Sequence, residues 1–183
     1  QDQAYIAAFG SAKKHIHILT PNLNDDDAIK SLAEAVSRGV QVKLITTFGF
    51  NRSTENYPGQ GGDNRKGYCR LYKTALKLTK NEKKVKEFLH LRWYTRPDGV
   101  RVDDSQSVVD DAGTGRPDAM HAKYATIDNE LAIVGTANMD TQSWNHSREI
   151  NLAVDSKEVT IAWDKKLFID VYKRSDLWEG PSS

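Results

Sequence analysis

The sequence lacks several features that would assign it to a familiar class at once. It contains one cysteine, Cys69, so no disulfide can form within the chain. No run approaches the roughly 18 apolar residues of a membrane-spanning helix, and the mean hydropathy of −0.64 is polar for a globular chain. The formal charge of +1 gives no argument for nucleic-acid binding. The glycine-rich stretch 49–65 lacks the GK[ST] ending of a nucleotide-binding loop.

The first 48 residues alternate between helical and strand patterns. A helix is predicted over 2–13, a strand over 15–20, a helix over 25–39 and an apolar strand over 40–48. This alternation predicts an α/β/α sandwich, with a mixed, mostly parallel sheet of about six or seven strands flanked by helices. The length of 183 residues fits a single domain over 1–183. The chain begins at Gln1 rather than Met, which indicates a processed product or a fragment.

The rest of the chain continues with further helix and strand patterns. The segment 96–118 is irregular and partly acidic, and its spacing does not match a calcium-binding loop. The predicted elements are a helix over 66–87, strands over 88–95, 121–127, 130–138 and 149–154, and a last helix over 156–173.

Two of these strands form a hairpin that gathers polar side chains at one end. His121 and Lys123 alternate with Ala122 and so share one face. A two-residue turn at Asp128-Asn129 would place Thr136 opposite His121, and a shift by one would place Asn138 there. An imidazole, an ammonium, a hydroxyl and a carboxamide together suit a phosphate group, which the imidazole can attack while the others hold its oxygens.

The spacing of these residues resembles a known signature. It reads His121-x-Lys123, four residues, Asp128, six residues, then Gly135-Thr136-x-Asn138, and it resembles the HKD motif of the phospholipase D superfamily. The resemblance extends to Asp140, Ser143 and Glu149. It implies a phosphohistidine intermediate, no metal and no cofactor. It also implies a second HKD motif, and this chain has one, so the other must come from a first repeat or from a copy of the chain in a homodimer. The helix-first start looks like the second, carboxyl-terminal repeat of a two-repeat member.

The resemblance also assigns roles to the motif residues. His121 is the expected nucleophile or general acid/base, and Glu149 is expected to hydrogen-bond the catalytic histidine and hold its tautomer. Asp128, seven residues from His121, is read as a turn residue that accepts hydrogen bonds. The expected catalytic residues are His121, Lys123, Asn138 and Glu149, the phosphate ligands Lys123, Thr136 and Asn138, and the structural residues Asp128 and Gly135.

Loops beyond the carboxyl ends of the early strands are expected to shape the substrate site. The candidate substrate-loop residues are Asn22, Phe50, Asn51 and Ser143. No metal site is expected, because His15 and His17 have no carboxylate or cysteine at ligand spacing.

Cations along the predicted helix 66–87 allow two interpretations. A contact with an anionic membrane surface through Arg70, Lys73 and Lys77 is one, and a solvated helix face is the other. The function most expected is a phosphodiesterase or transphosphatidylase acting on phospholipid headgroup esters. A metal-independent homodimeric nuclease and a non-catalytic phosphate-binding half-domain are the alternatives.

Overall fold

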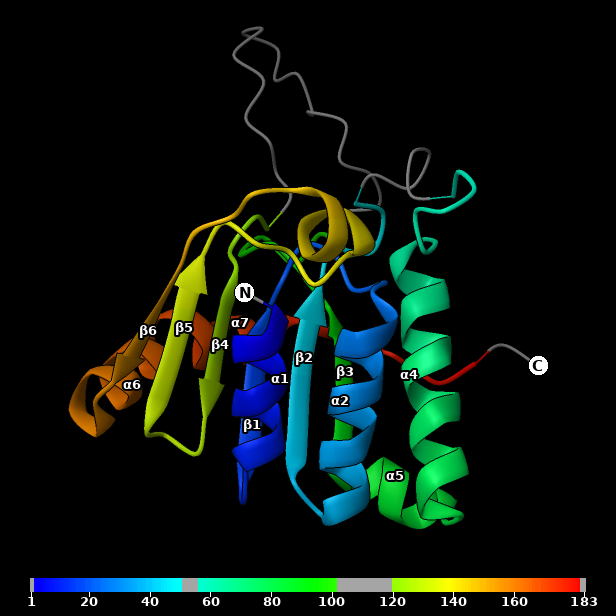
Figure 1. Ribbon diagram of the computed structural model, residues 1–183, viewed down its shortest axis with the longest axis horizontal. Helices are drawn as coiled ribbons and strands as arrows, with labels where there is room; N and C mark the ends of the chain where they lie inside the picture. Colours follow the sequence, from blue (N-terminus) through cyan, green and yellow to red (C-terminus); the bar gives the residue numbers. More distant parts are fainter. Residues whose placement is uncertain (1, 51–55, 102–119, 182–183) are drawn as a thin grey trace, which may run out of the picture.

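The computed structural model describes residues 2–50, 56–101 and 120–181, and its strands form one seven-stranded sheet (Figure 1). The order across the sheet is β6-β5-β4-β1-β2-β3-β7. The strands are β1 (His15–Leu19), β2 (Gln41–Thr46), β3 (Leu89–Trp93), β4 (Tyr124–Ile127), β5 (Leu131–Gly135), β6 (Asn151–Asp155) and β7 (Asp176–Leu177). The helices are α1 (Asp2–Ser11), α2 (Asp26–Arg38), α4 (Asn64–Thr79), α5 (Glu82–Phe88), α6 (Lys157–Asp164) and α7 (Asp170–Arg174), with π-helical turns η1 (Gln142–His146) and η2 (Lys165–Ile169).

The sheet is mixed, as the sequence predicts, but the expectation that it is mostly parallel is wrong. Among the described strands, β1–β2 and β2–β3 are parallel, and the four remaining pairings are antiparallel. A parallel pair needs a long crossover, and α2 and α4 with α5 supply one each. The later strands β4 and β5 are joined by a tight turn, so the chain reverses between them. The prediction extended the alternation of the first 48 residues to strands that do not share it.

Helices cover both faces of the sheet and create two cores. Figure 1 shows α1, α2 and α4 in front of the sheet, with α6 and α7 behind it. The larger core lies on the α1, α2 and α4 side and includes Phe9, Leu32 and Leu71, each fully buried. The smaller core includes Ile45 and Phe168 on the opposite side. The α/β/α arrangement therefore follows from strands that bury both faces.

The alternation of β1 explains its two histidines. Ile16 and Ile18 enter the larger core, whereas His17 faces the smaller one and stacks on Phe168 at 4.5 Å between ring centroids. The His17 Nδ1 lies 2.9 Å from the Asp164 carboxylate, which also accepts a hydrogen bond from Thr126 Oγ1 at 3.0 Å. His17 thus belongs to a buried polar cluster that joins the sheet to α6.

The predicted helix over 25–39 is present with both of its caps. The Asp25 carboxylate accepts hydrogen bonds from the backbone N–H groups of Asp27 and Ala28, which starts α2. Gly39 ends it in the left-handed conformation, at φ 88°. The short link from Gly39 to β2 then brings β2 alongside β1 in parallel.

The single helix predicted over 66–87 is wrong, because the chain forms two helices there. Lys80 adopts a left-handed conformation at φ 51° and ends α4. The side chain of Asn81 then accepts a hydrogen bond from the Lys84 backbone N–H and starts α5. Neither glycine nor proline marks this break, so the sequence pattern continues across it.

One edge of the sheet collects the loops that carry the motif residues. Leu19 at the carboxyl end of β1 pairs with Tyr124 at the amino end of β4. Gly135 at the end of β5 pairs with Asn151 at the start of β6. Residues 120–123, 136–149 and the loops after β1 and β2 therefore meet at this edge, which lies at the top of Figure 1.

Candidate active site

The hairpin register differs from both predicted ones by a single residue. Tyr124 pairs with Val134 and Ile127 with Leu131, so paired residue numbers sum to 258. The connection has three residues, because Asp128 and Asn129 take positive φ values of 55° and 60° and Glu130 lies outside the ladder. The Gly135 backbone N–H donates to the Lys123 carbonyl at 3.3 Å. Neither Thr136 nor Asn138 therefore stands directly opposite His121.

His121 and Lys123 contact each other just before β4 begins. The Lys123 Nζ lies 2.8 Å from His121 Nδ1, 3.0 Å from Nε2 and 2.9 Å from the His121 carbonyl oxygen. An ammonium can only donate, so it pairs with a ring nitrogen that carries no proton, and the contact favours the neutral imidazole. Burial, together with the Lys123 charge, lowers the pKa of His121 below its usual 6.5. His121 is exposed, so its neutral ring faces solvent at neutral pH.

Lys123 is itself perturbed. Burial lowers its pKa from 10.5 to about 8, although the carboxylates of Asp140 and Glu149 act to raise it. The edge thus holds a neutral imidazole and a cation that titrates near neutrality.

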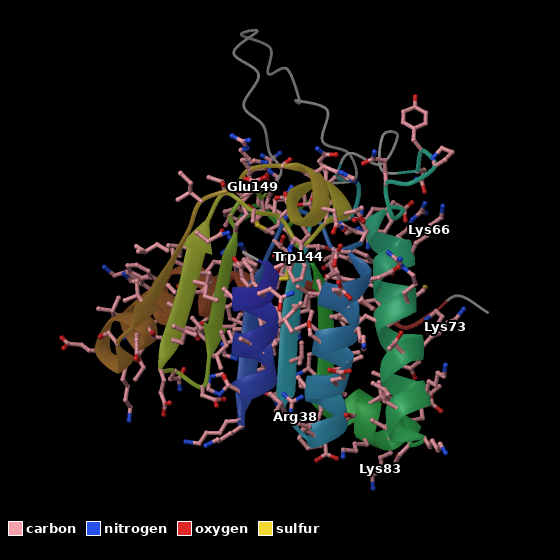
Figure 2. The ribbon with its side chains drawn as sticks, viewed as in Figure 1. Arg38, Lys66, Lys73, Lys83, Trp144 and Glu149 are labelled. Atoms are coloured by element: carbon pink, nitrogen blue, oxygen red, sulfur yellow. The ribbon has the colours of Figure 1, made fainter. Side chains whose placement is uncertain are left out.

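Glu149 is held by hydroxyl groups rather than by the motif histidine. Among the described contacts, its carboxylate accepts hydrogen bonds from Thr136 Oγ1 and from Ser143 Oγ, the latter at 3.2 Å. The expected hydrogen bond from a His121 ring N–H to the Glu149 carboxylate is not among them, and the ring nitrogens of His121 contact Lys123 instead. Figure 2 shows Glu149 at the upper edge of the fold, beside η1.

Asn138 and Asn22 converge on one buried carboxylate. The amide nitrogen of Asn138 donates to Asp140 Oδ2 at 2.9 Å, and that of Asn22 reaches the same oxygen at 3.4 Å. The carboxamide oxygens of both asparagines are buried and have no hydrogen-bond partner among the described residues. Asp140 therefore orients both amides; the resemblance to the motif included Asp140 but assigned it no role.

The π-helical turn η1 fixes the position of Asn138 from the other side. The Asn138 backbone N–H donates to Ser143 Oγ at 3.1 Å, and Trp144 Nε1 donates to the Asn138 carbonyl at 3.0 Å. Trp144 also stacks on Tyr5 of α1 at 5.9 Å. The residues after β5 are thereby anchored to the larger core.

The loop after β2 adds an aromatic side chain to the site. The Phe50 ring lies 5.6 Å from the His121 ring between centroids. Thr47 Oγ1 donates to the Met120 carbonyl at 3.2 Å, which ties this loop to the residue before the motif. Of the four candidate substrate-loop residues, Asn22, Phe50 and Ser143 thus lie among the motif residues, and Asn51 lies outside the described part of the chain.

Asp128 lies at the opposite end of the hairpin. Its carboxylate accepts hydrogen bonds from the backbone N–H groups of Lys13, Lys14 and His15, at 2.8 to 2.9 Å. Burial acts to raise the pKa of Asp128, but these backbone hydrogen bonds outweigh it and hold the pKa below 3.8. Asp128 therefore clamps the turn to the chain entering β1, at the opposite end of the hairpin from His121 and Lys123.

Gly135 is required by a close approach of two strands. A Cβ atom there would collide with the Ile150 carbonyl oxygen and the Asn151 side chain. Only glycine lets β5 and β6 meet at the point where Thr136 and Glu149 leave the sheet.

The described residues also bear on metal binding and on the predicted membrane contact. No cluster of three or more His, Cys, Asp or Glu side chains that could hold a metal ion occurs within the described residues. Arg70 is not free to face a membrane, since its guanidinium contacts Asp26 at 2.6 Å and the carbonyls of Asn24 and Gly61. Lys66, Lys73 and Lys83 do project outward along α4 and the start of α5 (Figure 2). No described helix is long and apolar enough to span a membrane.

The sequence of this chain is similar to part of known cardiolipin synthases. Cardiolipin synthase 2 of Bacillus cereus is 26% identical over 148 residues, which cover 80% of this chain and 21% of that protein. The chain therefore spans about a fifth of the length of the curated relatives it matches.

Two solved structures share the fold. The phospholipase D family member Nuc of Salmonella typhimurium aligns with a TM-score of 0.63 and 15% identity, covering 96% of this chain and 89% of that one. Phosphatidylserine synthase of Haemophilus influenzae aligns with a TM-score of 0.65 and 16% identity, covering 98% of this chain and 37% of that one. A family model described as "Cardiolipin synthase, PLD-like domain" matches residues 5–168. With the motif and fold in agreement, the chain belongs to this phospholipase D-like family.

Proposed function

We propose that this chain carries one half of a phosphodiesterase or transphosphatidylase centre that acts on phospholipid headgroup esters. The observation that carries the proposal is the contact between the Lys123 ammonium and the neutral ring of His121. A neutral imidazole can attack phosphorus, and an ammonium beside it can bind a phosphate oxygen. Glu149, Asp140 and Asn138 surround this pair at the same edge of the sheet.

The proposed reaction proceeds in two displacement steps. A ring nitrogen of His121 forms a bond to phosphorus while the ester P–O bond breaks, and a second imidazole protonates the departing oxygen. That second imidazole then takes a proton from water or an alcohol, whose oxygen attacks phosphorus and releases His121. Water gives hydrolysis, and an alcohol gives transfer of the phosphatidyl group.

The proposal calls for a second HKD motif because this chain carries one; the exposed His146 of η1 also lies in the segment 136–149, but no lysine follows it two residues later. Among the described residues, the ring of His17 is buried with Asp164 on the other side of the sheet, and His90 sits on β3 near Glu87. The second imidazole is therefore assigned to another repeat or another copy of the chain, with the motif 121–149 facing its counterpart.

Side chains around the pair supply binding and positioning. Lys123, Asn138 and Thr136 are the proposed phosphate ligands; Asn138 has a second amide hydrogen for this role, whereas Thr136 must first release its hydrogen bond to Glu149. Because Glu149 accepts hydrogen bonds from Thr136 and Ser143, we assign it to holding these hydroxyls and the Lys123 charge in place.

The test is headgroup release from phosphatidylcholine vesicles, with EDTA present and the mass of the assembly measured in solution. Headgroup release by a dimer or a two-chain complex, abolished by His121→Ala and retained by His90→Ala, is the expected result. Plasmid cleavage in place of lipid cleavage would support the nuclease alternative. A monomer inactive on both substrates would favour the non-catalytic half-domain, and activity that survives His121→Ala would reject the proposed chemistry.

A further inference from the structure

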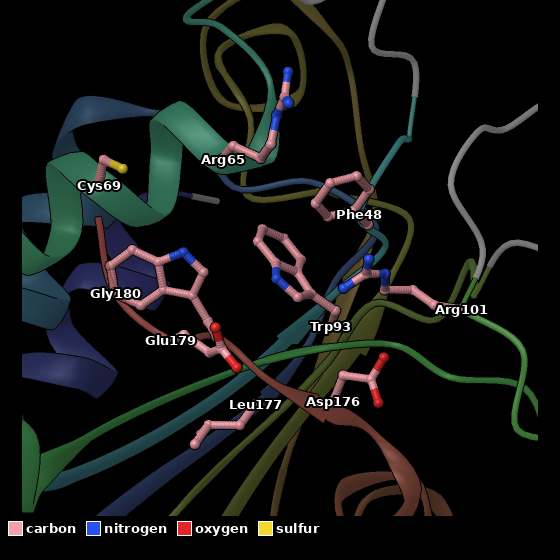
Figure 3. Close-up of a pocket in the computed structure, with 10 residues that line it drawn as sticks. Phe48, Arg65, Cys69, Trp93, Arg101, Asp176, Leu177, Glu179 and Gly180 are labelled. Carbon is pink, nitrogen blue, oxygen red and sulfur yellow. The ribbon is translucent and has the colours of Figure 1, made fainter. Parts of the chain in front are cut away.

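A cavity of about 600 Å³, whose lining does not include the motif residues, opens near the loop after β2 (Figure 3). Residues from five separate segments line it, and they come from that loop, the start of α4, β3, Arg101 and the stretch from β7 to Gly180. The motif residues His121 and Lys123 are not among them. The volume is that of a small-molecule site rather than of a gap between side chains.

Positive charge is concentrated on one wall of this cavity. The guanidinium groups of Arg65 and Arg101 lie 5.6 Å and 4.7 Å from the centre of the Phe48 ring. Arg65 also contacts the Asp63 carboxylate at 3.1 Å, which fixes its orientation. A guanidinium has five N–H donors in a planar fork, so this contact leaves donors for a phosphate.

The other walls are aromatic and acidic. Trp93 packs edge-on against Phe48 at 5.1 Å, and Trp178 adds a half-buried indole to the lining. Asp176 pairs with Trp93 across β3 and β7, and its exposed carboxylate and that of Glu179 border the same space. In Figure 3 the labelled Arg65 and Arg101 lie above and beside Trp93, and Asp176 and Glu179 lie below it.

We infer that this cavity binds a nucleoside phosphate. The arginines would hold the phosphate, the aromatic and guanidinium surfaces would stack on the base, and the carboxylates would accept hydrogen bonds from its amino groups. A phosphocholine-type headgroup would use the carboxylates and a ring for its cation, but the Phe48 ring already contacts two guanidinium groups. Such a headgroup would also leave most of the volume of about 600 Å³ to water.

The position of the cavity relates it to the motif. Phe48 lines it, and Phe50 two residues later contacts His121 at 5.6 Å between ring centroids. Two residues span at most about 7 Å along the chain. The inference goes beyond the proposed function, because it adds a nucleotide site next to the motif and leaves the diester cut at His121 as proposed above.

Cys69 allows occupancy to be measured without turnover, because this half-exposed residue lines the cavity and is the single cysteine of the chain. The rate of its alkylation by iodoacetamide is followed by mass spectrometry in the full chain. Cytidine and adenosine monophosphates are expected to protect Cys69 saturably, whereas inorganic phosphate and phosphocholine at equal concentration do not. Protection by a short single-stranded oligonucleotide or by UDP-glucose identifies the source, and either result supports the inference.

Substitutions of Arg65 and Arg101 then test whether the positively charged side of the cavity binds the phosphate. Arg65→Gln and Arg101→Gln are each expected to weaken nucleotide protection about tenfold, whereas Lys73→Gln on the same helix α4 leaves it unchanged. Circular dichroism confirms that each variant is folded. Quenching of tryptophan fluorescence, reduced by Trp178→Phe, provides a second readout if Cys69 does not react.

The result that overturns the inference is equal protection by phosphocholine, or nucleotide effects absent from both readouts. His121→Ala is expected to keep full protection. Nucleotide binding that persists in a protein without diesterase activity would therefore reject the proposed function alone, and activity without nucleotide binding would reject this inference alone.

Discussion

Lys123 links the structure to a measurable pH dependence. Its pKa is lowered from 10.5 to about 8 by burial, so the ammonium proposed to bind the phosphate is lost just above neutrality. Catalysis also needs a neutral His121, whose pKa lies below 6.5. The profile of kcat/KM, which reports the free enzyme, is therefore expected to be bell-shaped, with a rise below pH 6.5 and a fall centred near pH 8.

The magnitude follows from the fraction of molecules that keep the proton. With a pKa of about 8, about a tenth of the molecules keep the Lys123 ammonium at pH 9. kcat/KM at that pH should thus be about tenfold below its maximum, and it should fall about tenfold further for each additional pH unit. The acidic limb, in contrast, reflects His121 and should not respond to changes at position 123 that keep a positive charge.

The decisive variant is Lys123→Arg. A guanidinium stays protonated over the whole range, so the alkaline limb should disappear while the acidic limb remains, even if the maximum is lower. The assay is hydrolysis of bis(4-nitrophenyl) phosphate by the assembled protein in EDTA, with each sample brought to alkaline pH before absorbance is read. Lys73→Arg, an exposed cation on α4, is the matched control. An alkaline limb near pH 8 that persists in Lys123→Arg would refute the assignment.

Three further outcomes are expected. Asp128→Ala removes the acceptor of three backbone hydrogen bonds and should lower the free energy of unfolding by about 2–3 kcal/mol in urea titrations, leaving kcat of the folded fraction unchanged. Because the folded-state pKa of Asp128 lies below 3.8, this contribution is present at neutral pH and is lost as the pH falls through that pKa, so a wild-type advantage unchanged at pH 2 would contradict it. Gly135→Ala should disrupt the β5–β6 pairing and lower both melting temperature and activity, and a normal melting temperature would show that the strands can separate at no cost. Asn138→Ala should lower kcat/KM by about 10²–10³-fold and also lower the melting temperature, because the buried Asp140 carboxylate loses a hydrogen bond, whereas Gln142→Ala, on the exposed side of η1, should change neither.

Much of the fold could be predicted from patterns of residues that lie close together in the sequence. The caps of α2 at Asp25 and Gly39 and the apolar strands could be predicted, because each depends on residues close together in the chain. The break at Lys80 could not, since a lysine in the left-handed conformation leaves no trace in the pattern. The prediction of the hairpin register failed for a similar reason. Glu130 lies in the turn and not in the strand pairing, and this one extra residue shifts every pair that follows.

The sequence allowed the residues of the candidate site to be predicted, but not the hydrogen bonds between them. Spacing alone named His121, Lys123 and Asn138, because a motif is a property of sequence. The convergence of Asn22 and Asn138 on Asp140 depends on β1 and β5 ending at the same edge, with more than a hundred residues between the two asparagines. The cavity beside Phe48 joins still more distant segments and has no sequence signature.

The clamp at Asp128 separates two kinds of constraint within one short motif. Three backbone N–H groups, of Lys13, Lys14 and His15, donate to that carboxylate, while the proposed role of the imidazole at the far end of the hairpin is chemical and not structural. A descendant could therefore discard its histidine, keep its aspartate and persist as a correctly folded protein with no turnover. Loss of Asp128 alone would instead lower the stability of the fold while leaving the polar side chains of the site in place. Inactive relatives should therefore retain the aspartate at this position more often than the histidine.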